Sequence, residues 1–303
     1  MNLPNFLIIG AAKSGTSALY RYMKQHPDIY MSPIKETHFF SYKDSPPNTR
    51  GPGDTINRAI TDFDTYKSLF AGVTNELAIG EASPTYIYNM RAPLLIKQIL
   101  PEARLITILR QPADRAFSAF MHVIRDKREP EKDFSKALEL EQERINQNWG
   151  PIWHYEKGGY YFDQLSRYYN LFDRQQIRVY LHDEFSANPK LVLQDIFQFL
   201  GVDDQYIPDV SMKANVSGIQ KSEIADWMME RLFNRTNPLR YIARQIVSED
   251  LRWRVTASVR GRNLNRPVIP PDIRVDLTAR YREDILNLQK LIDRDLMHWL
   301  EKW

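Results

Sequence analysis

The chain of 303 residues contains no cysteine. This absence excludes disulfide bonds, thiolate nucleophiles and zinc sites with cysteine ligands. No apolar run approaches the roughly 18 residues that a membrane-spanning helix needs. The first residues carry neither a basic segment nor a small-residue cleavage site, so they do not resemble a secretory signal peptide. These absences favour a cytoplasmic protein.

Metal-ligand spacings are missing as well. The six histidines are scattered, no two of them lie three or four positions apart, and no run of carboxylates accompanies them. Zinc and calcium sites usually need such groupings. We therefore expect chemistry that uses no metal.

Positive charge is concentrated near the C-terminus. The net charge is only +3, but nine arginines lie between Arg231 and Arg266, against Glu249 and Asp250. Such a block can face an anionic ligand or an anionic lipid surface, or it can be a solvated helical face. It lacks the repeated aromatic residues of a nucleic-acid stacking platform, so nucleic acid is not the expected partner. Peripheral contact with a membrane stays open.

Strand patterns alternate with helix patterns along the chain. Short apolar runs predict strands at 6–9, 77–79, 104–109 and 177–181. Helical spacing predicts helices at 17–25, from Pro112 onward, and at 134–148, 161–172, 189–200 and 272–300. This alternation is typical of an α/β fold with a parallel sheet flanked by helices. No repeat or linker interrupts it, so residues 1–303 are predicted to form a single domain.

The first strand leads into the loop Gly10-Ala-Ala-Lys13-Ser14-Gly15-Thr16-Ser17. A strand, a glycine loop and a helix N-terminus together aim backbone N–H groups at an anion. The loop is not a Walker A motif, because its lysine precedes the second glycine. Taken alone, it is equally compatible with a tight turn in which Gly15 supplies conformational freedom.

Four further blocks, in order, make the chain similar to the sulfotransferases that use 3′-phosphoadenosine 5′-phosphosulfate (PAPS). The resemblance is strongest to the branch of the heparan sulfate 3-O-sulfotransferases and their bacterial relatives. It implies a P-loop-NTPase-like sulfotransferase fold, with PAPS as co-substrate and adenosine 3′,5′-bisphosphate as product. The loop from Lys13 to Thr16 belongs to the same pattern. The four further blocks are His26-Pro27 with Glu36-Thr-His38-Phe-Phe40, Leu109-Arg110-Gln-Pro112 with Ser118, Gly159-Tyr-Tyr161 with Glu184-Phe185, and the pattern from Arg266 to Trp299.

The resemblance also implies roles for individual residues. Lys13 contacts the transferring sulfuryl group and its leaving oxygen, where negative charge develops. Ser14, Gly15, Thr16 and Ser17 complete the phosphosulfate loop. The predicted ligands of the 3′-phosphate and the rest of the nucleotide are Arg110, Ser118, Tyr161 and Arg262.

Glu36 is the predicted base that removes the proton of an acceptor hydroxyl, and His38 assists it. In an extended segment residues two apart point to the same side, so both side chains can face one cavity. The alternative is a surface ion pair of Glu36 with Lys35. Ser41 and Ala82 stand where the heparan branch carries an acidic residue and a lysine, which favours another acceptor: a sugar, a glycolipid or a secondary metabolite.

Two other functions remain as alternatives. One is a P-loop kinase or NTPase that uses ATP and magnesium. The other is a module that binds anions on the same fold without catalysis. The misplaced lysine counts against the kinase, because the Walker lysine follows the second glycine.

Overall fold

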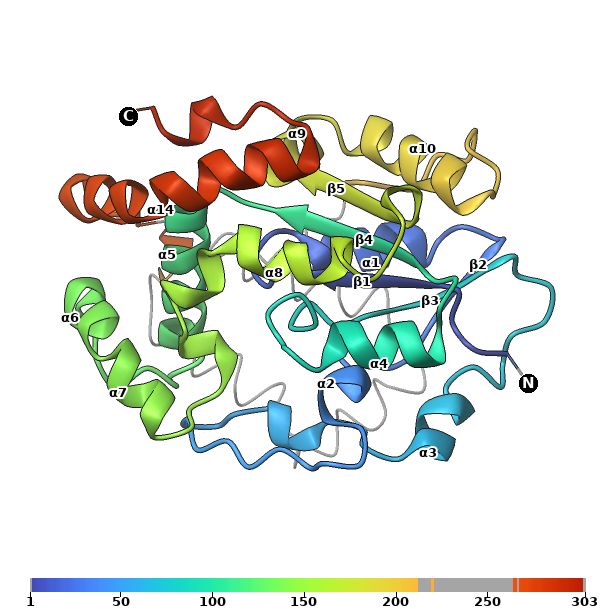
Figure 1. Ribbon diagram of the computed structural model, residues 1–303, viewed down its shortest axis with the longest axis horizontal. Coiled ribbons are helices and arrows are strands. Elements are labelled where there is room, and N and C mark those ends of the chain that lie inside the picture. The colour runs from blue at the N-terminus through green and yellow to red at the C-terminus, as the bar shows by residue number, and fades with distance from the viewer. Residues whose placement is uncertain (1, 212–218, 221–263, 266, 302–303) are drawn as a thin grey trace.

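A parallel five-stranded sheet forms the centre of the molecule, with strands in the order β2-β3-β1-β4-β5 (Figure 1). The computed structural model describes residues 2–211, 219–220, 264–265 and 267–301. The strands of the sheet are β1 (Phe6–Gly10), β2 (Ile29–Met31), β3 (Ala78–Ala82), β4 (Arg104–Leu109) and β5 (Ile177–Leu181). A separate antiparallel pair joins β6 (Ile219–Gln220) to β7 (Leu264–Asn265).

Helices connect the strands and cover both faces of the sheet (Figure 1). The first half of the chain contains α1 (Thr16–Met23), α2 (Phe39–Tyr42), α3 (Phe63–Ser68), α4 (Ala92–Ile99), α5 (Pro112–Arg125), α6 (Phe134–Glu139) and α7 (Glu141–Asn146). The second half contains α8 (Tyr161–Tyr169), α9 (His182–Ala187), α10 (Pro189–Leu200) and α14 (Pro271–Ile292). Single 3-10 turns lie at Ile56–Arg58, Pro151–Trp153, Lys157–Gly159, Arg174–Gln176 and Met297–Trp299.

Side chains of β1 alternate between two apolar layers, because successive residues of a strand point to opposite faces. Phe6 and Ile8 pack with α1 and α10, whereas Leu7 and Ile9 pack with α2, α3 and α4. All four are fully buried. A central parallel strand is covered on both sides, which explains why its sequence is a continuous apolar run.

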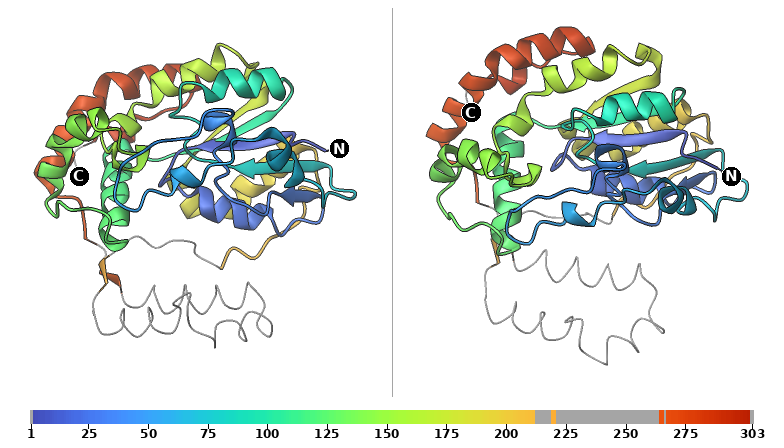
Figure 2. Two further views of the ribbon diagram at one scale, coloured as in Figure 1. Left: turned by 90° about the horizontal axis from the view of Figure 1, so that it is seen from below. Right: turned by 60° about the horizontal axis from the view of Figure 1, so that its bottom comes forward.

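A second group of helices packs beyond the end of the sheet. Helix α14 lies beside α8 and also contacts α5, as both views of Figure 2 show. Leu277, Tyr281 and Ile285 of α14 are buried in this cluster, and Tyr281 donates a hydrogen bond to the carbonyl of Glu156 at 2.8 Å. These contacts fix α5, which provides one wall of the site described below.

The predicted sheet is confirmed, with differences at the element ends. Strand β3 runs to Ala82, so that Glu81 lies inside the sheet rather than in the loop predicted after residue 79. The predicted helix at 134–148 is two short helices that meet at Leu140, and the helix predicted to end at 300 ends at Ile292. The three-residue strand β2 was not predicted, because such a short run gives little periodicity.

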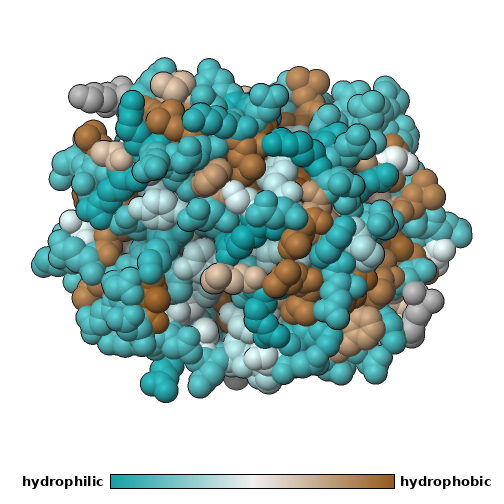
Figure 3. Space-filling view, viewed as in Figure 1, coloured by the Kyte–Doolittle hydropathy of each residue, from teal (hydrophilic) through white to brown (hydrophobic). Residues whose placement is uncertain are grey.

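Hydrophilic side chains predominate on the face of the molecule in Figure 3, and most of its larger hydrophobic groups lie on the right half. Within the described part of the chain, no helix combines the length and the apolar character needed to cross a membrane.

Replacement of Gly80 by alanine is expected to destabilise the sheet. A Cβ atom at Gly80 would lie 2.2 Å from Cζ of Phe6, whose strand pairs directly with β3. Overpacking of this kind costs about 1–3 kcal/mol of unfolding free energy, measurable as a lower midpoint in urea.

Gly72→Ala is the matched control for this prediction. A Cβ at exposed Gly72 would meet only the hydroxyl end of Tyr30, at 3.1 Å and beyond. Its expected loss is below about 1 kcal/mol. Equal losses in the two variants would contradict the proposed packing of Gly80 against Phe6.

Candidate active site

A cavity of about 270 Å³ lies at the carboxyl ends of the parallel strands. Ligands of open α/β sheets usually bind at this edge. The residues that follow β1, β3, β4 and β5 all contribute to its wall. They include Ala11, Ala12 and Lys13 after β1, Pro84 and Thr85 after β3, Arg110 after β4, and His182 after β5.

The loop between β1 and α1 forms the floor of this cavity. Gly15 precedes α1 with φ 103°, a conformation that side chains disfavour, and Lys13 has φ 72°. A Cβ at Gly10 would lie 2.4 Å from Cγ2 of Ile87, so the strand end also requires glycine. Thr16 and Ser17 line the cavity at the first turn of α1, where backbone N–H groups have no intrahelical acceptors. This geometry suits an anion.

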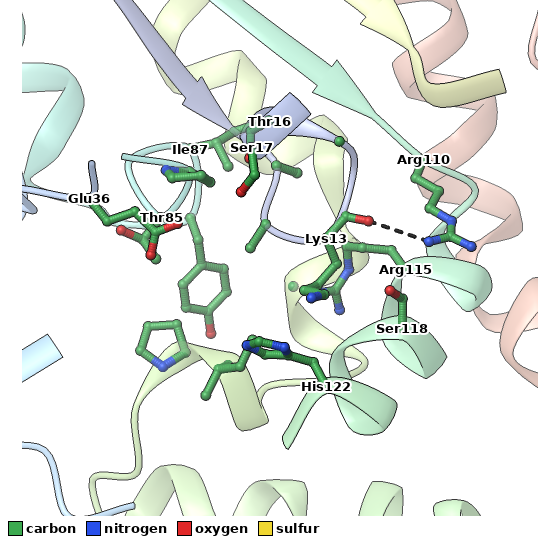
Figure 4. A pocket seen from close by; sticks show the side chains of 18 of the residues that line it. Lys13, Thr16, Ser17, Glu36, Thr85, Ile87, Arg110, Arg115, Ser118 and His122 are labelled. Carbon is green, nitrogen blue, oxygen red and sulfur yellow. Dashed lines mark hydrogen bonds between the residues drawn. The ribbon is translucent and has the colours of Figure 1, made fainter. Parts of the chain in front are cut away.

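Lys13 lies between two groups of side chains in the cavity (Figure 4). Glu36 and Thr85 lie on one side of it, and Arg110, Arg115 and Ser118 lie on the other. Burial and the nearby Arg125 guanidinium lower the pKa of Lys13 to about 7. Bound negative charge would oppose this shift and favour the protonated lysine.

Arg110 and Ser118 are brought together by the turn from β4 into α5. Helix α5 begins at Pro112 because Gln111 caps it, its side chain accepting the N–H of Asp114 at 2.9 Å. Arg110 donates to the Lys13 carbonyl at 3.4 Å, which ties this turn to the loop between β1 and α1. Burial lowers the pKa of Arg110 somewhat, although Asp114 opposes the shift.

Two cavity residues on α5 escaped sequence analysis, Arg115 and His122. With Ser118 they are spaced by three and then four residues, which is the spacing of one helical face. Buried Arg115 donates to the carbonyl of His154 at 3.4 Å and to that of Tyr155. The polar face of an otherwise apolar helix was the signal that could have revealed them.

His122 is held in one neutral form. Arg125 Nη2 lies 2.7 Å from His122 Nδ1, and arginine can only donate, so Nδ1 accepts and Nε2 carries the proton. Asp126 Oδ2 lies 3.6 Å from that Nε2. Burial and the Lys13 cation lower the pKa of His122 to about 3. The ring is therefore a neutral wall of the cavity at physiological pH.

Glu36 and His38 meet the cavity from a strained turn. Their φ angles are 66° and 54°, which for residues other than glycine cost roughly 1–3 kcal/mol each. Glu36 N–H donates to the Ala82 carbonyl at 2.8 Å, and His38 Nδ1 lies 2.9 Å from Thr85 Oγ1. The turn is thus fastened to the end of β3, and both side chains line the cavity.

Glu36 is an ionised carboxylate within this wall. Its side chain is 44% exposed and forms an ion pair with Lys35. The ion pair expected as an alternative is therefore present, and Glu36 lines the cavity as well. Partial burial raises the pKa of Glu36, but Lys35, His38 and Lys13 outweigh it and hold the pKa below its usual value. Burial lowers the pKa of His38, which keeps that ring neutral.

The outer wall comes from two loops distant in sequence. Asp54, Thr55 and Ile56 lie on the long loop after α2, and Pro151 and Ile152 lie on a 3-10 turn. Arg128 joins the two, as its Nε donates to the Pro52 carbonyl at 3.0 Å and its guanidinium lies over the Trp153 ring at 4.8 Å. These loops close the Glu36 side of the cavity.

Two predicted nucleotide ligands do not line the cavity, and a third is not among the described residues. Ser14 is fully buried, is absent from the cavity wall, and its N–H donates to the Ala11 carbonyl at 3.2 Å. Tyr161 is also fully buried and outside the wall; its hydroxyl donates to the Arg110 carbonyl at 2.9 Å and so supports the turn behind the cavity. Arg262, together with most of the arginine-rich segment, lies outside the described residues.

Comparison with known proteins identifies the family. Residues 4–206 match the sulfotransferase family. A crystal structure of a sulfotransferase from Alicyclobacillus acidocaldarius is 37% identical, with a TM-score of 0.78, and the match covers 99% of this chain and all of that one. The chain therefore belongs to the sulfotransferase family, and its sulfotransferase fold, predicted from the sequence, is confirmed.

Curated relatives agree with this assignment. A bifunctional heparan sulfate N-deacetylase/N-sulfotransferase 4 of Mus musculus is 26% identical over 68% of this chain. The membrane-associated sulfotransferase kil1 of Dictyostelium discoideum is 36% identical over 39% of it. The matched segments span only 23% and 22% of those two proteins.

Family and fold support an enzyme that transfers a sulfuryl group. Among the residues that the structure describes, no group of three or more histidine, aspartate and glutamate side chains is placed to hold a metal ion. The cations available to an anionic substrate in the described wall are side chains, namely Lys13, Arg110, Arg115 and Arg128.

The lowered pKa of Lys13 predicts unusual reactivity. Because its amine is half deprotonated near pH 7, acetic anhydride should label Lys13 at pH values where ordinary lysines, with pKa values near 10.4, react little. Peptide mass spectrometry of samples labelled at pH values from roughly 5 to 11 gives the pH at which labelling of Lys13 is half complete.

The cause of the shift is testable by charge removal. Arg125→Ala should move the labelling midpoint of Lys13 upward, because a repelling cation is lost. Arg282→Ala, on the exposed side of α14, should leave it unchanged. A midpoint near the ordinary lysine value in the unmodified protein would overturn the assignment.

Proposed function

We propose that this protein transfers the sulfuryl group of PAPS to a hydroxyl group of an acceptor. The proposal rests on one observation: Lys13 lies in the cavity between Arg110 and Ser118 at one end and Glu36 at the other (Figure 4). A donor with two phosphate groups fits the end with Arg110 and Ser118, and an acceptor that must lose a proton fits the end with Glu36. Family membership supports sulfuryl transfer itself.

The donor is proposed to lie along the β1–α1 loop and the first turns of α5. The loop N–H groups, Thr16 and Ser17 would hold the 5′-phosphosulfate at the helix N-terminus. Arg110 and Ser118, with the buried Arg115 beside them, would hold the 3′-phosphate, for which the planar arginine fork is well suited. Tyr161 contributes through the Arg110 turn rather than by direct contact.

The chemical step is an in-line displacement at sulfur. Glu36 takes the proton of the acceptor hydroxyl while the hydroxyl oxygen forms a bond to sulfur. At the same time the bond from sulfur to the bridging phosphate oxygen breaks. The electron pair of that bond stays on the phosphate of adenosine 3′,5′-bisphosphate, where Lys13 stabilises the new charge. His38, neutral and hydrogen-bonded to Thr85, orients the acceptor beside Glu36.

The acceptor is proposed to be a hydroxyl-bearing molecule, with carbohydrates as the first class to test. The outer wall mixes polar groups, Asp54, Thr55 and Arg128, with the apolar faces of Ile56 and Ile152. Such a lining suits a polyhydroxylated ring. The name of the murine relative refers to heparan sulfate, a glycan, which supports the same class.

Adenosine 3′,5′-bisphosphate should stabilise the protein in the absence of magnesium. A ligand at 100 times its Kd contributes about 2.7 kcal/mol, which a thermal shift measurement resolves as several degrees in Tm. ATP with magnesium is the comparison, because a P-loop kinase would respond to it. Stabilisation by ATP and magnesium alone would reject the sulfotransferase assignment in favour of the kinase.

Glu36→Gln and Arg110→Ala should separate catalysis from donor binding. Loss of the base should lower kcat by about 10²–10⁴-fold while the Kd of adenosine 3′,5′-bisphosphate changes little. Loss of the arginine should raise that Kd by about tenfold or more, because a charge-assisted contact is removed. Calorimetry measures the Kd, and transfer of labelled sulfate measures kcat. Equal loss of binding in both variants would assign Glu36 a structural role.

A further inference from the structure

A carboxylate that sequence analysis left without a role lies behind the catalytic turn. Glu81 is fully buried near the end of β3, on the face of the sheet that packs against α2, α3 and α4. It does not line the cavity. A buried carboxylate is costly unless hydrogen bonds replace its water, so its retention needs a physical reason.

Four hydroxyl groups of the described residues donate to this carboxylate. Thr37 and Ser83 donate to its Oε2, each at 2.9 Å. Tyr86 and Tyr66 donate to its Oε1, at 2.6 and 3.2 Å. Burial raises the pKa of Glu81, and the four hydrogen bonds oppose that rise. Four donors occupy the lone pairs of both oxygens, so this geometry is that of an ionised acceptor.

Because these hydroxyls donate their protons to Glu81, their oxygens act as acceptors for backbone N–H groups. A hydroxyl has one proton, and once that is donated its oxygen can only accept. Ser83 Oγ accepts the N–H of His38 at 3.1 Å, and Tyr86 Oη accepts that of Phe40 at 3.3 Å. Thr37 Oγ1 accepts the N–H of Phe39 at 3.3 Å.

Three successive backbone N–H groups are thus held by hydroxyls that one carboxylate orients. They belong to the turn that carries Glu36 and His38 in left-handed conformations, which persist only where the surroundings determine them. Tyr66 differs from the other three: its hydroxyl donates to Glu81, while its ring stacks on Phe39 at 4.1 Å, and no backbone N–H of the turn donates to it.

We infer that Glu81 is a positioning residue for sulfuryl transfer, acting through Thr37, Ser83 and Tyr86 to hold Glu36 and His38 at the cavity. The inference rests on the proposed role of Glu36 as base. It assigns the buried carboxylate an effect on turnover without contact to either substrate. Loss of one oriented hydroxyl leaves a buried N–H unpaired and lets the turn relax.

The test compares single-hydroxyl variants. Ser83→Ala and Thr37→Val each remove a hydroxyl that accepts a turn N–H, and each should lower kcat by about 10- to 100-fold, because small misplacement of a catalytic group is costly. The Kd of adenosine 3′,5′-bisphosphate should stay within about threefold, since uniform binding is untouched. Thr37→Ser keeps the hydroxyl and should retain turnover.

Tyr66→Phe is the matched control. It removes a donor to Glu81 of the same kind but keeps the ring, so kcat should be close to that of the unmodified protein. A loss of kcat in Tyr66→Phe equal to that in Ser83→Ala would overturn the proposal, because the effect would then come from general destabilisation. Loss of nucleotide binding in parallel with kcat would overturn it as well.

Glu81→Gln tests the anion itself. One amide nitrogen must donate where an oxygen accepted, so two hydroxyls lose their acceptor and kcat should fall as in Ser83→Ala. In a Glu36→Gln background the same change should cause a much smaller loss, because one of the two positioned groups is already absent and only the placement of His38 is still affected. Full additivity of the two changes would overturn the positioning role.

Hydrogen exchange separates this inference from the proposed function. Amides of residues 38–40 should exchange faster in Ser83→Ala than in Tyr66→Phe, whether or not the chain uses PAPS. Absence of PAPS-dependent transfer in the unmodified protein would reject the proposed function, and the exchange experiment would then still test whether Glu81 and its hydroxyls hold the turn. Unchanged exchange in Ser83→Ala would reject that positioning role.

Discussion

Burial of several cations in one cavity is the constraint on which the site depends. Lys13, Arg110 and Arg115 line one cavity in which burial weakens the screening of their charges. Backbone carbonyls hold the two arginines in place: Arg110 donates to Lys13, and Arg115 to His154. Burial, and after it the Arg125 cation, lowers the pKa of Lys13 to about 7. A bound anion would favour the charged form of each of these side chains.

Much of the fold was predictable because it depends on local patterns. The apolar runs of β1 and β4, the latter ending at Leu109, follow from burial on both faces of a parallel sheet. The break at Leu140 was not predictable, since the buried positions of both short helices (Phe134, Ala137, Glu141 and Arg144) continue one helical spacing. The depth of Glu81 was missed for a different reason: a charged residue in a strand argues against burial, and only hydroxyls from three other segments make it tolerable.

The candidate site was predictable where a motif fixes both the residue type and the direction in which its side chain points. Lys13, Glu36 and Arg110 lie on loops that follow strands, and all three reach the cavity. Ser14 shows the limit, because the positive φ angles on either side of it turn its side chain inward, which residue type alone does not reveal. His122 lies in the last turn of α5, where a polar residue is more often solvated than functional.

The outer wall of the cavity has a consequence for the evolution of this family. Asp54, Thr55 and Ile152 belong to loops that neither begin nor end at the strands carrying Lys13 and Arg110. Arg128 fastens those loops to one another rather than to the sheet. Insertions or exchanges in these two loops would therefore reshape the outer wall of the cavity and leave the β1–α1 loop and the turn after β4 in place. If the outer wall receives the acceptor, as proposed, one donor site can serve enzymes with different acceptors.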